Sequence, residues 1–175
     1  MQILDSHILV TGGAGFVGSQ IADALLAAGA GRVITLDNLV RGSRQNIEAA
    51  LRDDRFTFVE GDIRDAGLVD RLTRGCDYVF HEAALRITAC VEDPRAGHEV
   101  MNDGSFNVLE AAAAHGVKKI IAASSASVYG EPTSLPIDET APFNDRTLYG
   151  AAKIALERLL VAFNEMYRIP YIALR

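Results

Sequence analysis

The sequence predicts an α/β fold in which a doubly wound parallel sheet of about six strands carries helices on both faces. Short apolar runs alternate along the chain with longer segments of helical periodicity, which is typical of successive strand–helix–strand units. A glycine-rich turn joins the first apolar run to the first helical segment. The 175 residues, of which 49% are hydrophobic, suffice for one domain with its own core. We therefore expect residues 1–175 to form a single domain.

The six predicted strands are short apolar runs bounded by polar residues or glycine. Such runs fit strands that are buried on both faces of a parallel sheet. They lie at 8–10, 32–36, 56–59, 78–80, 119–123 and 171–174.

The predicted helices lie between these strands and place apolar residues on one stripe. They span 16–28, 43–51, 65–73, 94–115 and 148–167. In the first helix, Val17 and Leu25 share the stripe, and Gly29 follows as a stop signal. Ser43 is the expected N-cap of the second helix. Residues 130–144 contain three prolines and are predicted to form a loop.

Composition and charge argue against several classes of function. The net charge of −6 provides no basic surface for nucleic acid. No apolar stretch approaches the roughly 20 residues of a membrane span, and residues 1–7 lack a cationic signal-peptide start. Cys76 and Cys90 have no metal-site spacing and are expected to be reduced thiols. We therefore expect a cytoplasmic protein with no metal, membrane or nucleic-acid partner.

The glycine-rich turn spans 11–18 and has the spacing Gly-x-x-Gly-x-x-Gly. Gly12 permits the tight turn, Gly15 lets the backbone approach a pyrophosphate, and Gly18 allows close helix packing. Phe16 and Val17 begin the following helix, whose free N–H groups favour an anion. This segment predicts a dinucleotide site of the Rossmann type.

Asp37 follows the second predicted strand, about 20–25 residues after the first glycine. A carboxylate at that place accepts hydrogen bonds from the adenosine ribose hydroxyls and repels a 2′-phosphate. NAD is therefore favoured over NADP as the cofactor. Arg41 and Arg44 follow closely and could soften this preference.

Tyr149 and Lys153 open the longest predicted helix and are four residues apart, so they share one helix face. An ammonium group beside a phenol stabilises the phenolate, which makes Tyr149 a candidate general base. Serines 124, 125 and 127 follow the fifth predicted strand, at the sheet edge where such folds bind ligands. A serine hydroxyl there could hydrogen-bond both the phenol and a substrate hydroxyl.

These motifs together resemble the extended short-chain dehydrogenase/reductase family, the nucleotide-sugar epimerases and dehydratases. The resemblance covers essentially all of the chain. It rests on 11–18, Asp37-Asn38-Leu39, 61–65, His81-Glu82-Ala83-Ala84, 124–130 and 149–153. One departure is Met101, which stands where the family often has an asparagine.

The resemblance implies further cofactor contacts. Asn38 would belong to the ribose motif with Asp37, and Asp62 and Ile63 would bracket the adenine, with Asp62 accepting from its amino group. Ala83 and Ala84 would line the cofactor path. Arg86 falls where UDP-galactose 4-epimerases carry a lysine near the cofactor, and could serve its phosphates.

The resemblance also implies a catalytic set of Ser125, Tyr149 and Lys153 that acts on a nucleotide sugar, most simply a UDP-hexose. The 4,6-dehydratases place an Asp-Glu pair after the catalytic hydroxyl, where this chain has Ala126 and Ser127. A 4-epimerase that forms a 4-keto intermediate is therefore expected. The alternatives are a reductase, dehydratase or decarboxylase of the same family, or an NAD-binding protein without turnover.

Two expectations concern assembly. The family's C-terminal substrate domain, of about 100–150 residues by resemblance, is expected to be absent from residues 1–175. The two long predicted helices at 94–115 and 148–167 often form a dimer contact in relatives, so a homodimer is expected.

Overall fold

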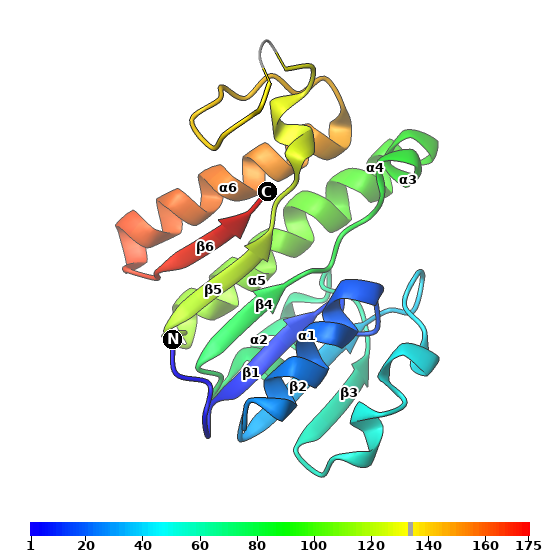
Figure 1. Cartoon of the computed structure of the whole chain (residues 1–175), viewed down its shortest axis with the longest axis vertical. Coiled ribbons are helices and arrows are strands. Elements are labelled where there is room, and N and C mark those ends of the chain that lie inside the picture. The colour runs from blue at the N-terminus through cyan, green and yellow to red at the C-terminus, as the bar shows by residue number, and fades with distance from the viewer. Residues whose placement is uncertain (133–134) are drawn as a thin grey trace.

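The computed structural model, which describes residues 1–132 and 135–175, has a six-stranded sheet in which every pair of neighbouring strands is parallel (Figure 1). The strand order is β3-β2-β1-β4-β5-β6. The strands are β1 (His7–Thr11), β2 (Arg32–Asp37), β3 (Phe56–Glu60), β4 (Tyr78–His81), β5 (Lys119–Ala123) and β6 (Tyr171–Leu174). This order confirms the doubly wound fold that the sequence predicts.

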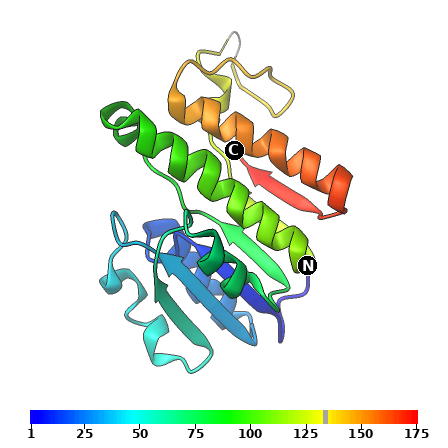
Figure 2. The same ribbon diagram turned by 180° about the vertical axis from the view of Figure 1, so that it is seen from behind.

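Helices cover the sheet in two layers. They are α1 (Phe16–Ala27), α2 (Ala66–Thr73), α3 (Ile87–Glu92), α4 (Pro94–His98), α5 (Ser105–Ala114) and α6 (Leu148–Tyr167). Figures 1 and 2 show α2, α5 and α6 on one face, and α1 on the other. Alternate strand residues serve the two layers: Leu9 packs toward α5, and Ile8 and Val10 pack toward α1.

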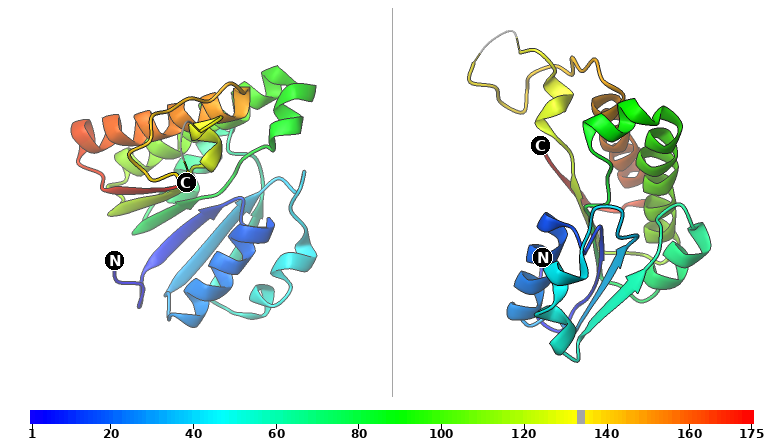
Figure 3. Two further views of the ribbon diagram at one scale, coloured as in Figure 1. Left: turned by 45° about the horizontal axis from the view of Figure 1, so that its top comes forward. Right: turned by 90° about the vertical axis from the view of Figure 1, so that its right-hand side faces the viewer.

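The α1 face of the sheet is covered mainly over β1, β2 and β3. The edge-on view of Figure 3 shows α1 beside those strands and the β6 end of the sheet without a helix on that side. Ile172 and Leu174 of β6 are accordingly 41% and 58% exposed. The predicted cover on both faces is therefore correct for the N-terminal half of the sheet, and one-sided at β6.

The chain reverses its direction of winding between β1 and β4, which are neighbours in the sheet. The loops at the carboxyl ends of these two strands consequently diverge and leave a crevice between them, where doubly wound folds bind ligands.

The helix predicted at 43–51 is wrong. The structure has two short 3₁₀ turns there, Arg44–Ile47 and Ala50–Arg52. The Ser43 hydroxyl does cap the first turn, by accepting from the Gln45 N–H at 3.2 Å. The Asn46 amide, however, donates to the Ala14 carbonyl at 2.8 Å, which ties the segment to the glycine turn. A tertiary anchor has overridden the weak local helix pattern.

The single helix predicted at 94–115 is also interrupted. A π-helical turn, Glu99–Gly104, separates α4 from α5, and the additional helix α3 precedes them. Two glycines lie inside the predicted helix, and glycine lowers helix stability. A Cβ at Gly104 would come within 2.7 Å of Ile63, so the close approach of that segment requires glycine.

The predicted loop at 130–144 contains no regular helix or strand in its described residues, and 133–134 lie outside the described part. No helix within the described ranges combines the length and the apolarity that a bilayer crossing requires.

Candidate functional site

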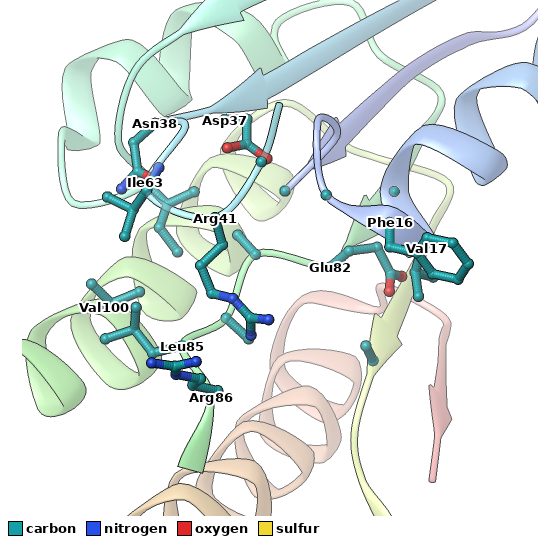
Figure 4. A pocket seen from close by; sticks show the side chains of 18 of the residues that line it. Phe16, Val17, Asp37, Asn38, Arg41, Ile63, Glu82, Leu85, Arg86 and Val100 are labelled. Carbon is teal, nitrogen blue, oxygen red and sulfur yellow. The ribbon is translucent and has the colours of Figure 1, made fainter. Parts of the chain in front are cut away.

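The site is a cavity of about 870 Å³ at the carboxyl ends of the strands, between the loops that follow β1, β2, β3, β4 and β5. Figure 4 shows side chains from these loops around it. The structure brings every sequence-predicted site residue to its wall. Those residues are Gly12, Gly15, Phe16, Val17, Gly18, Asp37, Asn38, Asp62, Ile63, Ala83, Ala84, Arg86, Ser125, Tyr149 and Lys153.

The glycine turn forms one wall of the cavity. Gly12 has φ +68°, and a Cβ there would lie 2.7 Å from the Ala83 nitrogen. A Cβ at Gly18 would collide with the Gly12 carbonyl oxygen, so Gly18 keeps α1 close to the turn itself. No side chain caps α1 at Gly15. The first N–H groups of a twelve-residue helix therefore remain available to an anion.

Asp37 occupies the adjacent corner, at the end of β2. Its carboxylate accepts from the Ala14 N–H at 3.0 Å and from the Leu39 N–H at 2.8 Å. These bonds fix the orientation of the carboxylate, and each oxygen retains a lone pair for a ribose hydroxyl. Arg44, by contrast, pairs with Glu60 at 3.1 Å and does not line the cavity.

The Asp62 carboxylate accepts hydrogen bonds from other groups of the protein. Its two oxygens accept from the Arg64 N–H, Nε and Nη2 and from the Asn38 Nδ2, at 2.9–3.1 Å. These bonds, chiefly those from Arg64, lower the pKa of Asp62 to about 2. Four donors fill the lone-pair sites of a carboxylate. The adenine contact implied for Asp62 therefore requires a donor such as Asn38 to move aside.

Lys153 lies at the floor of the cavity, beneath Tyr149. Its Nζ donates to the Ala123 carbonyl at 2.6 Å and lies 5.7 Å from the centre of the Tyr149 ring. Burial lowers the pKa of this 3%-exposed ammonium to about 8. The group is therefore a cation at neutral pH, with donors left over for a ligand.

Ser125 follows the end of β5 and lines the same cavity. Its hydroxyl donates to the Ser127 hydroxyl at 3.0 Å and accepts from the Ser127 N–H at 3.1 Å, which caps a short 3₁₀ turn. No hydrogen bond joins Ser125 to Tyr149 within the described residues. The three predicted catalytic groups thus share one cavity wall, with room for a substrate hydroxyl among them.

His81 does not enter the cavity. Its ring is buried, with Nδ1 2.7 Å from Thr11 Oγ1 and Nε2 2.9 Å from Ser105 Oγ. Burial lowers the pKa of His81 to about 3, so the ring is neutral. It joins β1, β4 and α5 as a structural group. The described residues contain no cluster of three or more potential metal ligands.

Sequence reasoning missed two groups at or beside the site. Glu82 lines the cavity half-buried, and burial raises its pKa. Glu157 follows Lys153 by one helical turn and accepts from the Ser124 hydroxyl. The four-residue spacing along α6 is a signal that could have revealed Glu157.

Replacing Lys153 by Met is expected to stabilise the free protein at pH 7 by about 1–2 kcal/mol, because a desolvated cation is removed. The folded-state pKa near 8 lies below the unfolded value near 10.5, so the penalty of burying the charge is fully present below pH 8. It is relieved as pH rises toward 10.5. Urea unfolding at several pH values should therefore show that the extra free energy of unfolding of the Lys153→Met variant shrinks between about pH 8 and 10.5. A variant whose extra stability is independent of pH, or which is less stable than wild type at pH 7, would contradict this prediction.

The sequence is similar to proteins of one known family over nearly its whole length. Residues 8–175 match the model of the NAD-dependent epimerase/dehydratase family. The putative UDP-glucose 4-epimerase of Methanocaldococcus jannaschii is 39% identical over 171 residues, which cover 96% of this chain and 54% of that protein.

Two solved structures are similar over nearly the whole chain. The Thermotoga maritima UDP-glucose 4-epimerase with UDP-glucose has a TM-score of 0.89 at 35% identity, covering 97% of this chain and 54% of that one. A dTDP-glucose 4,6-dehydratase double mutant from Streptomyces venezuelae with NAD bound has a TM-score of 0.90 at 34% identity, covering 95% and 54%. The chain thus spans about half the length of these relatives.

Proposed function

The chain belongs to the NAD-dependent epimerase/dehydratase family, and from that premise we propose that it is the cofactor-binding half of a nucleotide-sugar 4-epimerase. The observation that carries the proposal is the convergence of Ser125, Tyr149 and Lys153 on the cavity that the glycine turn borders. The substrate is a UDP-hexose, in keeping with the UDP-glucose 4-epimerases to which the chain is similar.

The residues of the cavity fit NAD. The glycine turn packs tightly, because a Cβ at Gly12 would meet the Ala83 backbone and a Cβ at Gly18 would meet the Gly12 carbonyl. The free N–H groups at the start of α1 are suited to an anion such as a diphosphate. Asp37 is oriented by two backbone donors for the ribose hydroxyls. NAD, when bound, supplies a reversible hydride acceptor for the sugar carbon.

The protein side of the reaction is proton transfer and positioning. The Tyr149 phenolate takes the proton of the sugar hydroxyl, and Ser125 orients that hydroxyl by hydrogen bonding. Lys153, held by the Ala123 carbonyl, stabilises the phenolate and presents its remaining donors to the cofactor ribose. Tyr149 would return the proton to the sugar oxygen, and hydride delivered by the cofactor to the other face of the keto carbon would invert that carbon without net redox change.

Epimerisation is favoured over dehydration by the residues that follow Ser125. Ala126 and Ser127 form the capped 3₁₀ turn and bring no carboxylic acid beside the hydroxyl. Glu82, the half-buried acid of the cavity, follows β4 and does not occupy a position after Ser125. Elimination of water by an acid–base pair after Ser125 therefore has no groups to perform it.

Turnover of a UDP-sugar panel tests the proposal, with the 175-residue chain compared with any longer product of the same gene. Inversion at a sugar carbon without NADH accumulation is expected of an epimerase. Steady NADH production or consumption would indicate a reductase or dehydrogenase instead. If the 175-residue chain binds NAD without turnover, it performs only the cofactor-binding part of the proposed function.

We also propose a cytoplasmic homodimer. Both cysteines are free thiols, in keeping with a reducing compartment. Helices α5 and α6 expose large apolar side chains, including Phe106, Met166 and Tyr167. Two copies of this surface would bury each other's apolar groups about a twofold axis. Sedimentation measurements distinguish such a dimer from a monomer.

A further inference from the structure

Helix α6 carries three ionisable side chains at four-residue spacing, Tyr149, Lys153 and Glu157, and therefore along one face. Figures 1 and 2 show this helix beside β5 and β6. Tyr149 and Lys153 line the cavity, and the proposed reaction uses both. Glu157 is only 7% exposed and has no part in that reaction. Burial of a carboxylate is unfavourable unless hydrogen bonds and a counter-charge compensate it, and Glu157 has both.

The Glu157 carboxylate holds the residue that immediately precedes Ser125. Its Oε1 accepts a hydrogen bond from the Ser124 hydroxyl, and Ser124 is 8% exposed. One turn earlier on α6, Lys153 Nζ donates to the Ala123 carbonyl at 2.6 Å. The Ser124 N–H donates to a β6 carbonyl at 2.8 Å, which continues the pairing of the two strands. Residues 123 and 124 are thus tied to α6 by two side chains and to β6 by the backbone.

The same carboxylate reaches the far end of the turn that Ser125 caps, through Arg175. Arg175 Nη2 and Nε donate to the Glu157 oxygens at 2.7 and 2.9 Å. Arg175 Nη1 donates to the hydroxyl of Tyr129, the last residue of that turn, at 2.9 Å, and the guanidinium lies 5.2 Å from the centre of the Tyr129 ring. Glu157 is therefore linked to the chain on both sides of Ser125, directly on one side and through Arg175 on the other.

The Ser125 hydroxyl depends on this support, because its own hydrogen bonds are local. In the part of the chain that the structure describes, they join it to Ser127 of its own turn, at 3.0 and 3.1 Å. Tyr149, by contrast, belongs to α6. The separation of the Ser125 hydroxyl and the Tyr149 phenol consequently depends on how the chain on either side of Ser125 is held against that helix.

We propose that Glu157 is a positioning residue for the reaction. It fixes the Ser125 hydroxyl relative to the Tyr149 phenol, and it does so through Ser124 on one side and Arg175 on the other. This inference rests on the proposed function, in which the hydroxyl and the phenol meet the same sugar hydroxyl. Groups that must converge on one substrate atom tolerate little error in their separation, and a displacement of about 1 Å can cost about 100-fold in rate.

Steady-state kinetics of Ser124→Ala, in any form of the protein that is active, tests the direct link. The substitution removes the hydroxyl that Glu157 holds and leaves Glu157 paired with Arg175. We expect kcat to fall about 10- to 100-fold, whereas KM and the affinity for NAD stay within about threefold. Ser105→Ala is the matched control, since its hydroxyl is also buried, binds His81 at 2.9 Å and lies outside the cavity wall. Its kcat should stay within about twofold of wild type, and a Ser124→Ala protein that does the same would refute the direct link.

A variant without the ion pair separates positioning from stability. Glu157→Leu combined with Arg175→Met removes both links while leaving neither charge buried alone, so most of the stability should be recovered. We expect kcat to stay reduced about 10- to 100-fold all the same. Adding Ser124→Ala should lower kcat by less than about threefold more, because the hydroxyl has already lost its acceptor. If kcat recovers together with stability, Glu157 serves stability alone and the proposal is wrong.

The geometry can also be measured without turnover. Crystal structures of wild type and of the Glu157→Leu/Arg175→Met variant should differ by on the order of 1 Å in the distance between Ser125 Oγ and Tyr149 Oη. An unchanged distance would contradict the proposal even if no form of the protein turned over a sugar. Full turnover by Tyr149→Phe would instead overturn the proposed reaction, whatever the Glu157 variants do.

Discussion

Replacing Tyr149 by Phe should lower sugar-nucleotide turnover about 10³-fold in any form of the protein that is active, because the phenol is the proposed general base. NAD affinity should change little, since the ring and the Lys153 ammonium beneath it both remain. The loss should therefore appear in kcat and in kcat/KM by the same factor, as for a group that acts in the transition state. Steady-state kinetics with the best UDP-sugar, alongside NAD titration, provides the measurement.

Tyr167→Phe is the control for that experiment. Tyr167 ends the same helix, is 53% exposed, and does not line the cavity. Its hydroxyl should be dispensable for turnover. A Tyr149→Phe enzyme that kept its rate to within about threefold would show that another group removes the proton.

Replacing Glu157 by Ala should lower the free energy of unfolding by about 3–5 kcal/mol, because it leaves Arg175, whose side chain is 19% exposed, without its counter-ion. Glu157 Oε2 accepts from Arg175 Nη2 at 2.7 Å, and Oε1 accepts from Arg175 Nε at 2.9 Å. The carboxyl is 7% exposed. Burial alone would raise the pKa of Glu157, but the hydrogen bonds from Arg175 and Ser124 hold it below its usual value.

The loss of unfolding free energy should be large because the Glu157–Arg175 ion pair joins several segments of the chain. Arg175 Nη1 also donates to the Tyr129 hydroxyl at 2.9 Å and to the Glu139 carbonyl at 3.0 Å. The pair therefore holds β6, α6, the turn after β5 and the following loop together. Urea unfolding followed by circular dichroism measures the change.

Two companion variants make the stability experiment decisive. Glu165→Ala removes an exposed carboxylate of the same helix, 3.9 Å from Arg168, and should cost less than about 0.5 kcal/mol. Glu157→Leu combined with Arg175→Met should recover most of the loss, because neither charge is then buried alone. A Glu157→Ala protein within about 1 kcal/mol of wild type would mean that solvent reaches Arg175 and compensates it.

The places where sequence reasoning failed share a cause. The predicted helix at 43–51 has an ordinary cap at Ser43, but Asn46 binds the Ala14 carbonyl, 32 residues away. The long helix predicted at 94–115 contains a π-helical turn that ends at Gly104, where the chain packs closely against Ile63. In both cases a contact with a distant segment outweighed a local preference, and a periodicity argument contains no information on such contacts.

The sequence by itself predicted the six parallel strands, the glycine turn and the loops that bring Asp37, Ser125, Tyr149 and Lys153 to one cavity. Strand alternation and motif spacing are local properties, and they fix which loops carry chemistry. Only the tertiary structure showed which charged side chains are paired with other groups of the protein. It joined Asp62 to Arg64 and Asn38 by hydrogen bonds and paired Glu157 with Arg175. Those outcomes depend on which side chains meet across loops and layers, and the packing of the whole sheet determines that.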